Sequence, residues 1–342
     1  MKIKNKMMNV CYNFITKTKP FEFEIQRPEG FVVKEILDRN SIKKYDLYGS
    51  RKYKYSIFLM KKVNTNTIDA VKNIANLLKI SGSDIGFAGL KDKNAVTYQY
   101  ISLKNELKDK INKLKDKLSE KKIELSYVSQ GKKLKPGDLI GNKFEIFMKP
   151  NPSNKFIKDF IESLTTASNL KIMPNYFGVQ RFGSNRNNHI IGYHILRREF
   201  EEANELMKKS NIKSSKKIMK FFINAYQSWI FNEIVNHIIK DKRNITKIKR
   251  NKIRMSSAPL PGFNSKPRKN FKWEIINKIH KDHGISLKDY RINELKLTAR
   301  GSERPLFINV KNITFNNELS FTLPKGSYAT VLLNEISKVR CP

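Results

Sequence analysis

Cysteine is nearly absent from this chain, whose 342 residues include only Cys11 and Cys341. Two cysteines so far apart exclude a framework of several disulfides and a CxxC metal knuckle. Long apolar runs are missing as well, because no segment approaches the roughly 18 residues that a membrane-spanning helix needs. Asn, Lys and Thr interrupt the basic N-terminus, which argues against a signal peptide. We therefore expect a soluble, cytoplasmic protein with no membrane partner.

Acidic residues are scarce relative to basic ones. Asp and Glu number 31 against 68 Lys and Arg, which gives a formal net charge of +37. Self-repulsion of this size destabilises a compact state, so a polyanionic partner is the simplest explanation. Nucleic acid is the leading candidate, since neutralisation of phosphates by Lys and Arg dominates such affinities. A low-GC genome explains some of the lysines but not the imbalance, because Asp and Glu do not rise in step.

Motifs of several common enzyme classes are also missing. Gly82, Gly86 and Gly89 are not followed by the Gly-Lys-Ser/Thr ending of a P-loop. The absence of G-x-G-x-x-G argues against a Rossmann-type methyltransferase, and no carboxylate cluster suggests a two-metal nuclease. His280 and His283 have an i, i+3 spacing, but their surroundings are rich in lysine and contain no cysteine. We expect no metal site.

Hydrophobic periodicity predicts an α+β protein, and the length favours two domains. Strands are expected at 21–25, 31–36, 53–60, 97–103, 123–129 and 143–149, and again within 306–336. Helices are expected at 68–78, 105–122 and 154–167, and through most of 187–240. Ends rich in strands around a helical middle predict an insertion in a larger domain. The lysine-rich helix 105–122 suits either RNA contact or a solvated surface, and the basic segment 240–254 is a candidate for RNA contact.

The first candidate site is the segment GLKDKNAVT, residues 89–97. It presents one carboxylate, Asp92, between Lys91 and Lys93, just before a predicted strand. A charged turn between two ordered elements is where a fold displays a reactive group. We therefore predict that Asp92 is the nucleophile of an RNA-modifying enzyme.

The second candidate is the loop NYFGVQRFG, residues 175–183, with three aromatics, two glycines and an arginine. Such a loop can offer a ring for base stacking, an amide for a base edge and a guanidinium for phosphate. The same sequence also fits a buried hydrophobic loop whose Arg181 reaches toward solvent.

Three further segments carry expectations as well. We expect residues 323–330 to form a turn and a strand, in which Tyr328 either lines a pocket or packs in the core. Arg304 is expected in a tight turn, holding a phosphate or a carboxylate, and the apolar residues 225–232 in a core helix.

Taken together, these segments resemble the TruD family of tRNA pseudouridine synthases. The matching blocks run in family order: FVVKE (31–35), GFAGLKDKNAVTYQ (86–99), LIGNKFEI (139–146), NYFGVQRFG (175–183), AYQSWIFN (225–232), PLPG (259–262) and LPKGSYATVLLNE (323–335). The resemblance implies an α+β fold: a pseudouridine synthase catalytic domain, residues 1–198 and 304–342, whose mixed, largely antiparallel sheet is flanked by helices. It also implies an inserted α/β domain of the TRUD type at residues 199–303.

The activity implied by the resemblance is isomerisation of a uridine to pseudouridine in tRNA, at uridine 13 of the D-arm. The N-glycosidic bond is cleaved, the uracil rotates, and its C5 joins C1′ of the ribose. Only an aspartate is essential, and no metal, nucleotide or redox cofactor is used. The matching residue is Asp92. Its carboxylate must stay ionised in a pocket shielded from water, so a neighbouring cation is expected from among Arg27, Lys91 and Lys93.

Other family positions carry over at their matching residues. Phe31 and Asn175 resemble substrate-pocket residues, Phe177 resembles the aromatic that stacks on the target base, and Tyr328 matches a further pocket position. Arg181 is expected to support the site as a basic residue. The expected partner is tRNA, bound by a monomer that has no protein partner.

Three alternatives stay open. The chain could be a non-catalytic basic RNA-binding protein on the same fold. It could instead be a structural component of a ribonucleoprotein, or a family member that acts on another tRNA position or another RNA.

Overall fold

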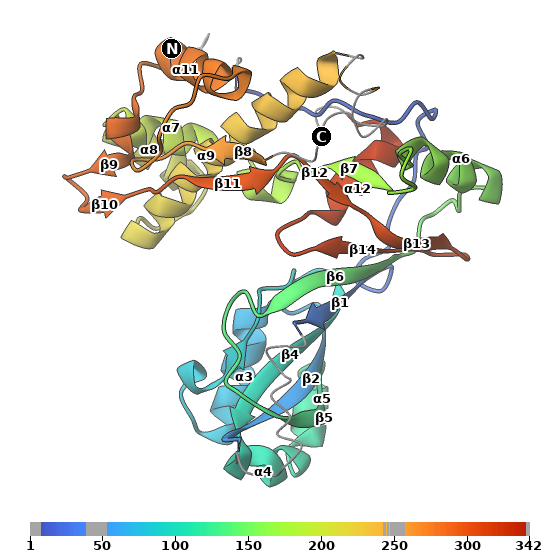
Figure 1. Ribbon diagram of the computed structural model, residues 1–342. Coiled ribbons are helices and arrows are strands. Elements are labelled where there is room, and N and C mark those ends of the chain that lie inside the picture. The colour runs from blue at the N-terminus through green and yellow to red at the C-terminus, as the bar shows by residue number, and fades with distance from the viewer. Residues whose placement is uncertain (1–7, 39–52, 242–243, 245, 247–256, 340–342) are drawn as a thin grey trace. The chain divides into compact units, whose positions relative to one another are not determined.

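The computed structural model describes residues 8–38, 53–241, 244, 246 and 257–339 (Figure 1). Contacts divide the chain into two compact units. The sheet unit comprises residues 22–157 and 310–326, and the helical unit comprises residues 1–21, 158–309 and 327–342. The predicted domain boundaries at 198/199 and 303/304 both lie within the helical unit. The division into a catalytic domain and an insertion remains a prediction.

The sheet unit is built on one eight-stranded sheet with the order β13-β14-β6-β1-β4-β2-β5, in which β3 also pairs with β4. The strands are β1 (Phe31–Leu37), β2 (Tyr55–Val63), β3 (Gly86–Phe87), β4 (Val96–Lys104), β5 (Ile123–Gly131), β6 (Leu139–Ile146), β13 (Lys311–Phe315) and β14 (Leu319–Pro324). Strands β1 and β4 run parallel, and the other pairs are antiparallel. The expected mixed, largely antiparallel sheet is confirmed.

Helix α3 (Thr67–Leu78) supplies most of the core on one face of this sheet. Its N-cap is Asn66, whose side chain accepts a hydrogen bond from the backbone N–H of Asp69. Apolar residues at helical spacing, among them Val71 and Ile74, are buried in one cluster with strand residues such as Ile101. The packing fixes the first turn of α3, and the Asp92 turn depends on that position.

The lysine-rich segment 105–122 does not form the single helix predicted for it. A 3₁₀ turn at Asn105–Leu107 leads into α4 (Lys108–Asn112), and α5 (Lys115–Glu120) follows. The break falls at Leu114, where φ is −107° and ψ is 7°, outside the helical range. The prediction that the apolar residues of this segment share one buried face is confirmed, because Leu107, Ile111 and Leu118 are all buried in the same core cluster.

The helical unit is organised around α9 (Lys216–Lys240), which is buried on nearly every side along its second half. Its other elements are most of α6 (Asn154–Leu164), β7 (Ile172–Pro174), α7 (Asn188–Leu196), α8 (Phe200–Lys209), β8 (Ser257–Leu260), α11 (Phe271–His283), β9 (Arg291–Ile292), β10 (Leu297–Thr298), β11 (Ser302–Pro305), β12 (Phe307–Asn309) and α12 (Ala329–Ser337), with short 3₁₀ turns at Val179–Phe182 and Leu287–Tyr290. The predicted helical run 187–240 is confirmed as α7, α8 and α9. The segment 225–232 is buried in α9, as expected for a core helix.

Three local predictions were wrong. Residues 21–25 form no strand beyond one isolated bridge, between Glu24 and Lys149. Residues 302–305, expected in a tight turn, form strand β11, which pairs with β8. Residues 328–330 begin a helix rather than a strand. Strand β14 ends at Pro324, which has no N–H to donate, Gly326 turns the chain at φ +79°, and α12 follows.

The basic segment 240–254, predicted as a candidate for RNA contact, lies mostly outside the described residues. None of the described helices has both the length and the apolar character needed to cross a bilayer.

Gly192 lets α7 approach α9 closely. A Cβ added at this position would lie 2.1 Å from the carbonyl oxygen of Phe222, which is backbone and cannot move aside. We predict that Gly192→Ala lowers the free energy of unfolding by about 1–3 kcal/mol, because overpacking outweighs the better helix propensity of alanine. Urea-induced unfolding of the purified chain measures the change.

Gly82→Ala is the matched control, since the nearest atom to its added Cβ is 3.8 Å away. Equal stability of the two variants would contradict the close α7–α9 contact.

Candidate active site

The Asp92 turn spans residues 88–95, between β3 and β4. Buried side chains hold its backbone by hydrogen bonds. The hydroxyl of Thr67, the first residue of α3, accepts a hydrogen bond from the backbone N–H of Lys91 at 2.8 Å. The same hydroxyl lies 2.8 Å from Oε1 of Gln99, to which it donates. The amide of Gln99 in turn donates to the carbonyl oxygen of Gly89 at 3.3 Å. Thr67 and Gln99 are fully buried, so the turn is anchored to α3 and β4 away from solvent.

Lys91 points into the protein rather than toward Asp92. Its Nζ lies 2.6 Å from Oε2 of Glu35, and the side chains of both residues are almost completely buried. The other carboxylate oxygen of Glu35 accepts a hydrogen bond from the backbone N–H of Tyr100 at 3.1 Å. Lys91 is thus committed to an internal ion pair, while the next residue, Asp92, is exposed. Of the cations predicted to support Asp92, Lys91 instead fixes the turn that carries it.

Arg27 is the predicted cation that lies near Asp92. Its Nη1 donates to the carbonyl oxygen of Asn94 at 2.8 Å, and its guanidinium lies 3.8 Å from the ring centroid of Phe31. Burial lowers the pKa of Arg27, and the charge of Asp92 acts in the opposite direction. The structure therefore brings Arg27, Phe31 and Asp92 into one neighbourhood, whereas Lys93 is exposed on the turn.

Lys62 is a second cation at Asp92, and sequence reasoning missed it. Its side chain is fully buried, and its Nζ donates to the backbone oxygens of Thr65 and, at 3.1 Å, of Asp92. Burial lowers the pKa of Lys62 to about 8, the charge of Asp92 raises it, and Lys91 lowers it further. The available signal was the alternation of β2, in which Phe58, Met60 and Lys62 share the buried face.

In the helical unit, the predicted pocket residues gather around the ring of Phe177. This ring makes an edge contact with Phe231 at a centroid distance of 5.6 Å and a tilted contact with Tyr328 at 6.1 Å. The guanidinium of Arg304 lies 4.0 Å from the ring centroid and that of Arg181 lies 5.8 Å away. Phe177, Arg181 and Tyr328 therefore form one cluster with a cationic side.

The backbone around Phe177 is held by side-chain amides. Asn232 accepts a hydrogen bond from the N–H of Phe177 at 2.9 Å and donates to its carbonyl oxygen at 3.0 Å. The oxygens of Asn175 accept two hydrogen bonds from Arg304, at 3.0 and 2.7 Å. Burial lowers the pKa of Arg304 to about 10, with Tyr328 opposing and Arg181 reinforcing the shift. Arg304 thus orients Asn175.

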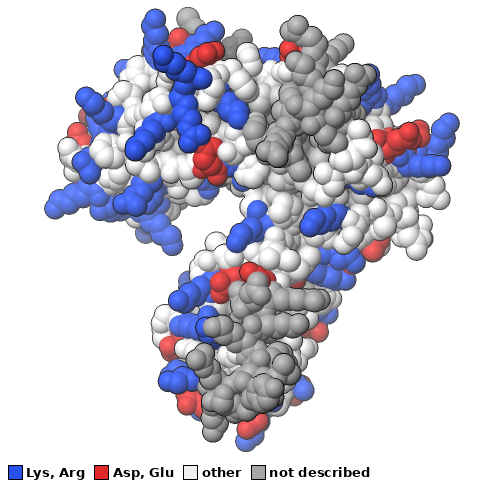
Figure 2. All heavy atoms as spheres, in the orientation of Figure 1, with Lys and Arg blue, Asp and Glu red and all other residues white. Residues whose placement is uncertain are grey.

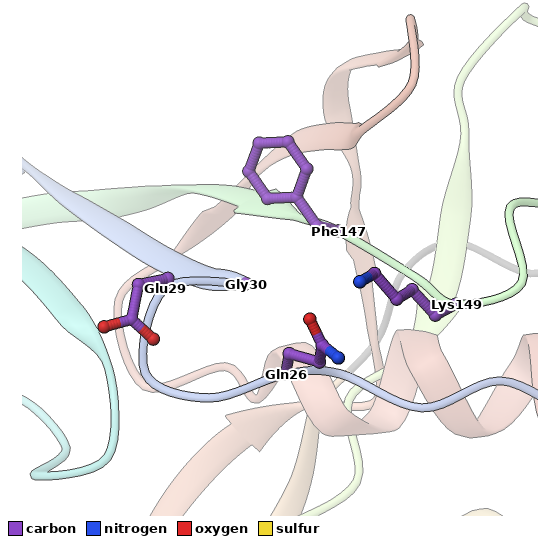
Figure 3. A pocket seen from close by; sticks show the side chains of 5 residues that line it. All are labelled: Gln26, Glu29, Gly30, Phe147 and Lys149. Carbon is purple, nitrogen blue, oxygen red and sulfur yellow. The ribbon is translucent and has the colours of Figure 1, made fainter.

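A separate hollow of about 490 Å³ in the sheet unit is lined by Gln26, Glu29, Gly30, Phe147 and Lys149 (Figure 3). The amide of Gln26 and the ammonium of Lys149 point toward its centre, and the carboxylate of Glu29 points away. The N–H of Phe147 donates to the carbonyl oxygen of Gly30, which continues the pairing of Phe31 with Ile146. Because side chains alternate along a strand, Phe147 and Phe31 project from opposite faces of the sheet. None of the residues lining this hollow is a predicted site residue.

The two histidines with i, i+3 spacing, His280 and His283, form hydrogen bonds with tyrosine hydroxyls. A ring nitrogen of His280 lies 3.1 Å from the hydroxyl of Tyr290, and one of His283 lies 2.8 Å from that of Tyr226. Burial lowers the pKa of His280 to about 4, so its imidazole is neutral at pH 7. Among the residues that the structure describes, no group of three or more His, Cys, Asp or Glu side chains is placed to hold a metal ion.

Comparison with solved structures gives the fold class first. A crystal structure of a putative tRNA pseudouridine synthase D (TruD) from Methanosarcina mazei superposes with a TM-score of 0.69 over 98% of both chains, at 23% identity. This likeness shows that the chain has the α+β fold of that protein. The family model described as tRNA pseudouridine synthase D (TruD) matches residues 11–219 and 240–336. The chain therefore belongs to the TruD family.

Curated relatives extend over nearly the full length. A probable tRNA pseudouridine synthase D from Thermococcus onnurineus is 30% identical, over 91% of this chain and 94% of its own. A tRNA pseudouridine synthase D from Sulfurimonas denitrificans is also 30% identical, over 97% of this chain and 99% of its own.

The buried ion pair gives a direct stability test. We predict that Lys91→Met lowers the free energy of unfolding by about 3–5 kcal/mol, because it leaves the buried carboxylate of Glu35 without its cation. Adding Glu35→Leu should recover most of that loss, since the double variant buries no charge at this position. Urea titrations of the single and double variants measure both values.

Lys34→Met is the control, because the side chain of Lys34 is 42% exposed and its partner Glu145 keeps a second lysine, Lys143, at 2.8 Å. Its expected cost stays below about 1 kcal/mol. A Lys91→Met variant as stable as the control would show that the pair does not anchor the turn.

Proposed function

We propose that this protein converts a uridine of tRNA to pseudouridine, at uridine 13 of the D-arm, and that Asp92 is its covalent catalyst. The observation that carries the proposal is the position of Asp92 in a family chain. It is an exposed carboxylate on a turn that buried side chains anchor, with Arg27 and Lys62 near it. The proposal places the reaction in the cytoplasm, with a monomer acting on tRNA.

The proposed reaction needs one carboxylate and no cofactor. The Asp92 carboxylate either attacks C1′ of the ribose and forms an ester as the N-glycosidic bond breaks, or withdraws the 2′ proton as that bond breaks. The uracil rotates and C5 bonds to C1′, while the ester bond to Asp92 breaks or the 2′ proton returns from Asp92. C5 then loses its proton, and N1 of the uracil gains one. Arg27 and Lys62 supply positive charge near Asp92, and the charge of Asp92 raises the pKa of both. Lys91 is instead paired with Glu35.

The remaining assignments concern the substrate pocket. Phe31 and Asn175 contact the nucleotide, Phe177 stacks on the target base, Tyr328 borders it, and Arg181 supports the site as a cation. The hydrogen bonds between Asn232 and the backbone of Phe177, and those that Arg304 donates to Asn175, support these roles, because they hold Phe177 and Asn175 in place before RNA binds. The target uridine must leave its stack to be reached. Residues 199–303 are assigned to the family insertion.

Asp92→Asn tests the catalyst directly. The amide cannot act as nucleophile or base, so we expect pseudouridine formation to fall by at least about a thousandfold while tRNA binding changes little. The measurement is carbodiimide-based mapping of pseudouridine after incubation with unmodified tRNA, with filter binding in parallel. If the unaltered, folded chain modifies no uridine in several tRNAs, the enzyme proposal fails and a basic RNA-binding protein remains.

Lys62 gives the proposal a pH signature. The Lys62 ammonium loses its proton as the pH rises through about 8, and the positive charge facing Asp92 is lost with it. We therefore expect the single-turnover rate to fall above about pH 8 in the unaltered chain. Lys62→Met should be slower below that pH and should lack this alkaline decrease.

Lys61→Met is the matched control for the neighbouring lysine. Lys61 is bound to Glu124 at 2.8 Å, and that hydrogen bond raises its pKa. The alkaline decrease should persist in this variant. An unchanged profile in Lys62→Met would remove Lys62 from the mechanism.

A further inference from the structure

The helical unit contains a hollow of about 240 Å³ that none of the assigned site residues lines. It lies between the segment that joins the aromatic loop to α7 and the first turns of α9. Ser184, Asn185, Asn187 and Ser210 contribute polar groups, and Ile218 and Phe221 contribute apolar surface.

The apolar side of the hollow presents an aromatic ring to solvent. Phe221 is 40% exposed, although the adjacent Phe222 is fully buried. Ile218 lies three residues earlier on α9 and therefore on the same side of the helix. An exposed ring beside an aliphatic side chain offers a flat surface on which a planar heterocycle can stack.

The polar side offers amides that the local helix does not use. Asn187 is the N-cap of α7, yet its side chain makes no capping hydrogen bond. Asn185 donates to the hydroxyl of Ser210 at 3.1 Å, which ties the two edges of the hollow together. Asn188 donates to the carbonyl oxygen of Arg181 at 3.2 Å and so holds the segment against the aromatic loop. A side-chain amide combines a donor and an acceptor, the pairing that base edges require.

The charge around the hollow selects for an anionic ligand. The segments 163–198 and 206–232, which supply all of its lining residues, contain no Asp or Glu, and 206–232 alone contains six lysines. Basic side chains also outnumber acidic ones on the face of the helical unit that Figure 2 shows. The hollow of Figure 3 differs in this respect, because Glu29 forms part of its wall. Phosphates of RNA fit the lysine-rich surroundings of the smaller hollow.

Arg181 connects the hollow to the Phe177 cluster. Its guanidinium lies 5.1 Å from the ring centroid of Phe221 and 5.8 Å from that of Phe177. Its Nε also donates to the hydroxyl of Ser228 at 3.1 Å, which fixes it along α9. One arginine therefore contacts both the ring proposed to stack on the target uridine and the ring that borders the hollow.

We propose that this hollow binds the base of a second nucleotide of the tRNA substrate, close in sequence to the modified uridine. The base stacks on Phe221, and the amide of Asn187 contacts its edge. The order of bases around the target then contributes to substrate choice. This inference rests on the proposed function, because it takes the ring of Phe177 as the position of the target base.

The test is a coupling experiment between protein and RNA, carried out in the full-length Asp92→Asn chain so that the RNA stays unmodified. Binding is measured for tRNA transcripts with a single abasic site at each nucleotide of the D-arm in turn. We expect one abasic position to weaken binding about tenfold, the loss typical of a stacked base. In Phe221→Ala the same abasic site should cost less than about twofold, because the stacking surface is already gone.

Controls keep the experiment decisive. Phe271→Ala removes a similarly exposed ring on α11 of the same unit and should leave the full abasic effect in place. Phe221→Leu keeps apolar volume but removes the flat face, so it should behave like Phe221→Ala. Uniform weakening by Phe221→Ala on intact and abasic RNA alike would overturn the pocket.

The outcome separates this inference from the proposed function, because coupling is read from binding alone. Pseudouridine formation without coupling at any position overturns the pocket and leaves the enzyme proposal intact. Coupling in a chain whose unaltered form makes no pseudouridine supports base binding in the hollow and overturns the enzyme proposal.

Discussion

The buried ion pair between Lys91 and Glu35 is the constraint on which the candidate site depends. A charge enclosed in this way is tolerated only with its partner, so β1 and the turn must keep one relative position. The backbone of Lys91 is held as well, through the hydroxyl of Thr67. The side chain of Lys91 is buried in this pair, whereas that of the next residue, Asp92, is exposed. The turn that presents Asp92 to solvent is thus held through its neighbour.

In the helical unit, the loop that carries Phe177 is fixed by hydrogen bonds to neutral side chains rather than by an ion pair. Asn232 serves both backbone groups of Phe177, since one amide provides a donor and an acceptor. Tyr176, the residue between the two assigned pocket positions, donates its hydroxyl to Asn236 at 2.7 Å. Neutral amides on the buried face of α9 achieve order here without a buried charge. Their arrangement leaves the cations Arg181 and Arg304 facing the ring of Phe177.

Much of the fold could be predicted from the sequence where one periodicity dominates. The alternation in 31–36 predicted β1, and the apolar repeat in 68–78 predicted α3, because each pattern fits a single element. The apolar repeat of 105–122 could not reveal the break at Leu114, since the same residues face the core in one helix or two. The run after Tyr328 is short and apolar, and such runs do not distinguish a strand from a helix.

The candidate site was less accessible to sequence reasoning. The motif around Asp92 predicted that residue as the catalyst. Alternation does not hold across a turn, so the inward direction of Lys91 could not be predicted. Lys62 escaped notice because a lysine in a strand is usually taken to face solvent. Its burial follows the alternation of β2, and in the sheet Lys62 lies opposite the buried Thr97 of β4.

A rise in pH changes the contribution of Lys62 to stability and its contribution to the proposed reaction in opposite directions. Its pKa of about 8 in the folded chain lies below the ordinary lysine value of 10.5, so between these limits the unfolded chain binds more protons than the folded one. The contribution of this residue to stability therefore increases as the pH rises through that range. The charge it provides beside Asp92 declines over the same interval. Near neutral pH the protein keeps a destabilising ammonium inside its sheet unit, a cost in stability that a purely structural residue at this position would not impose.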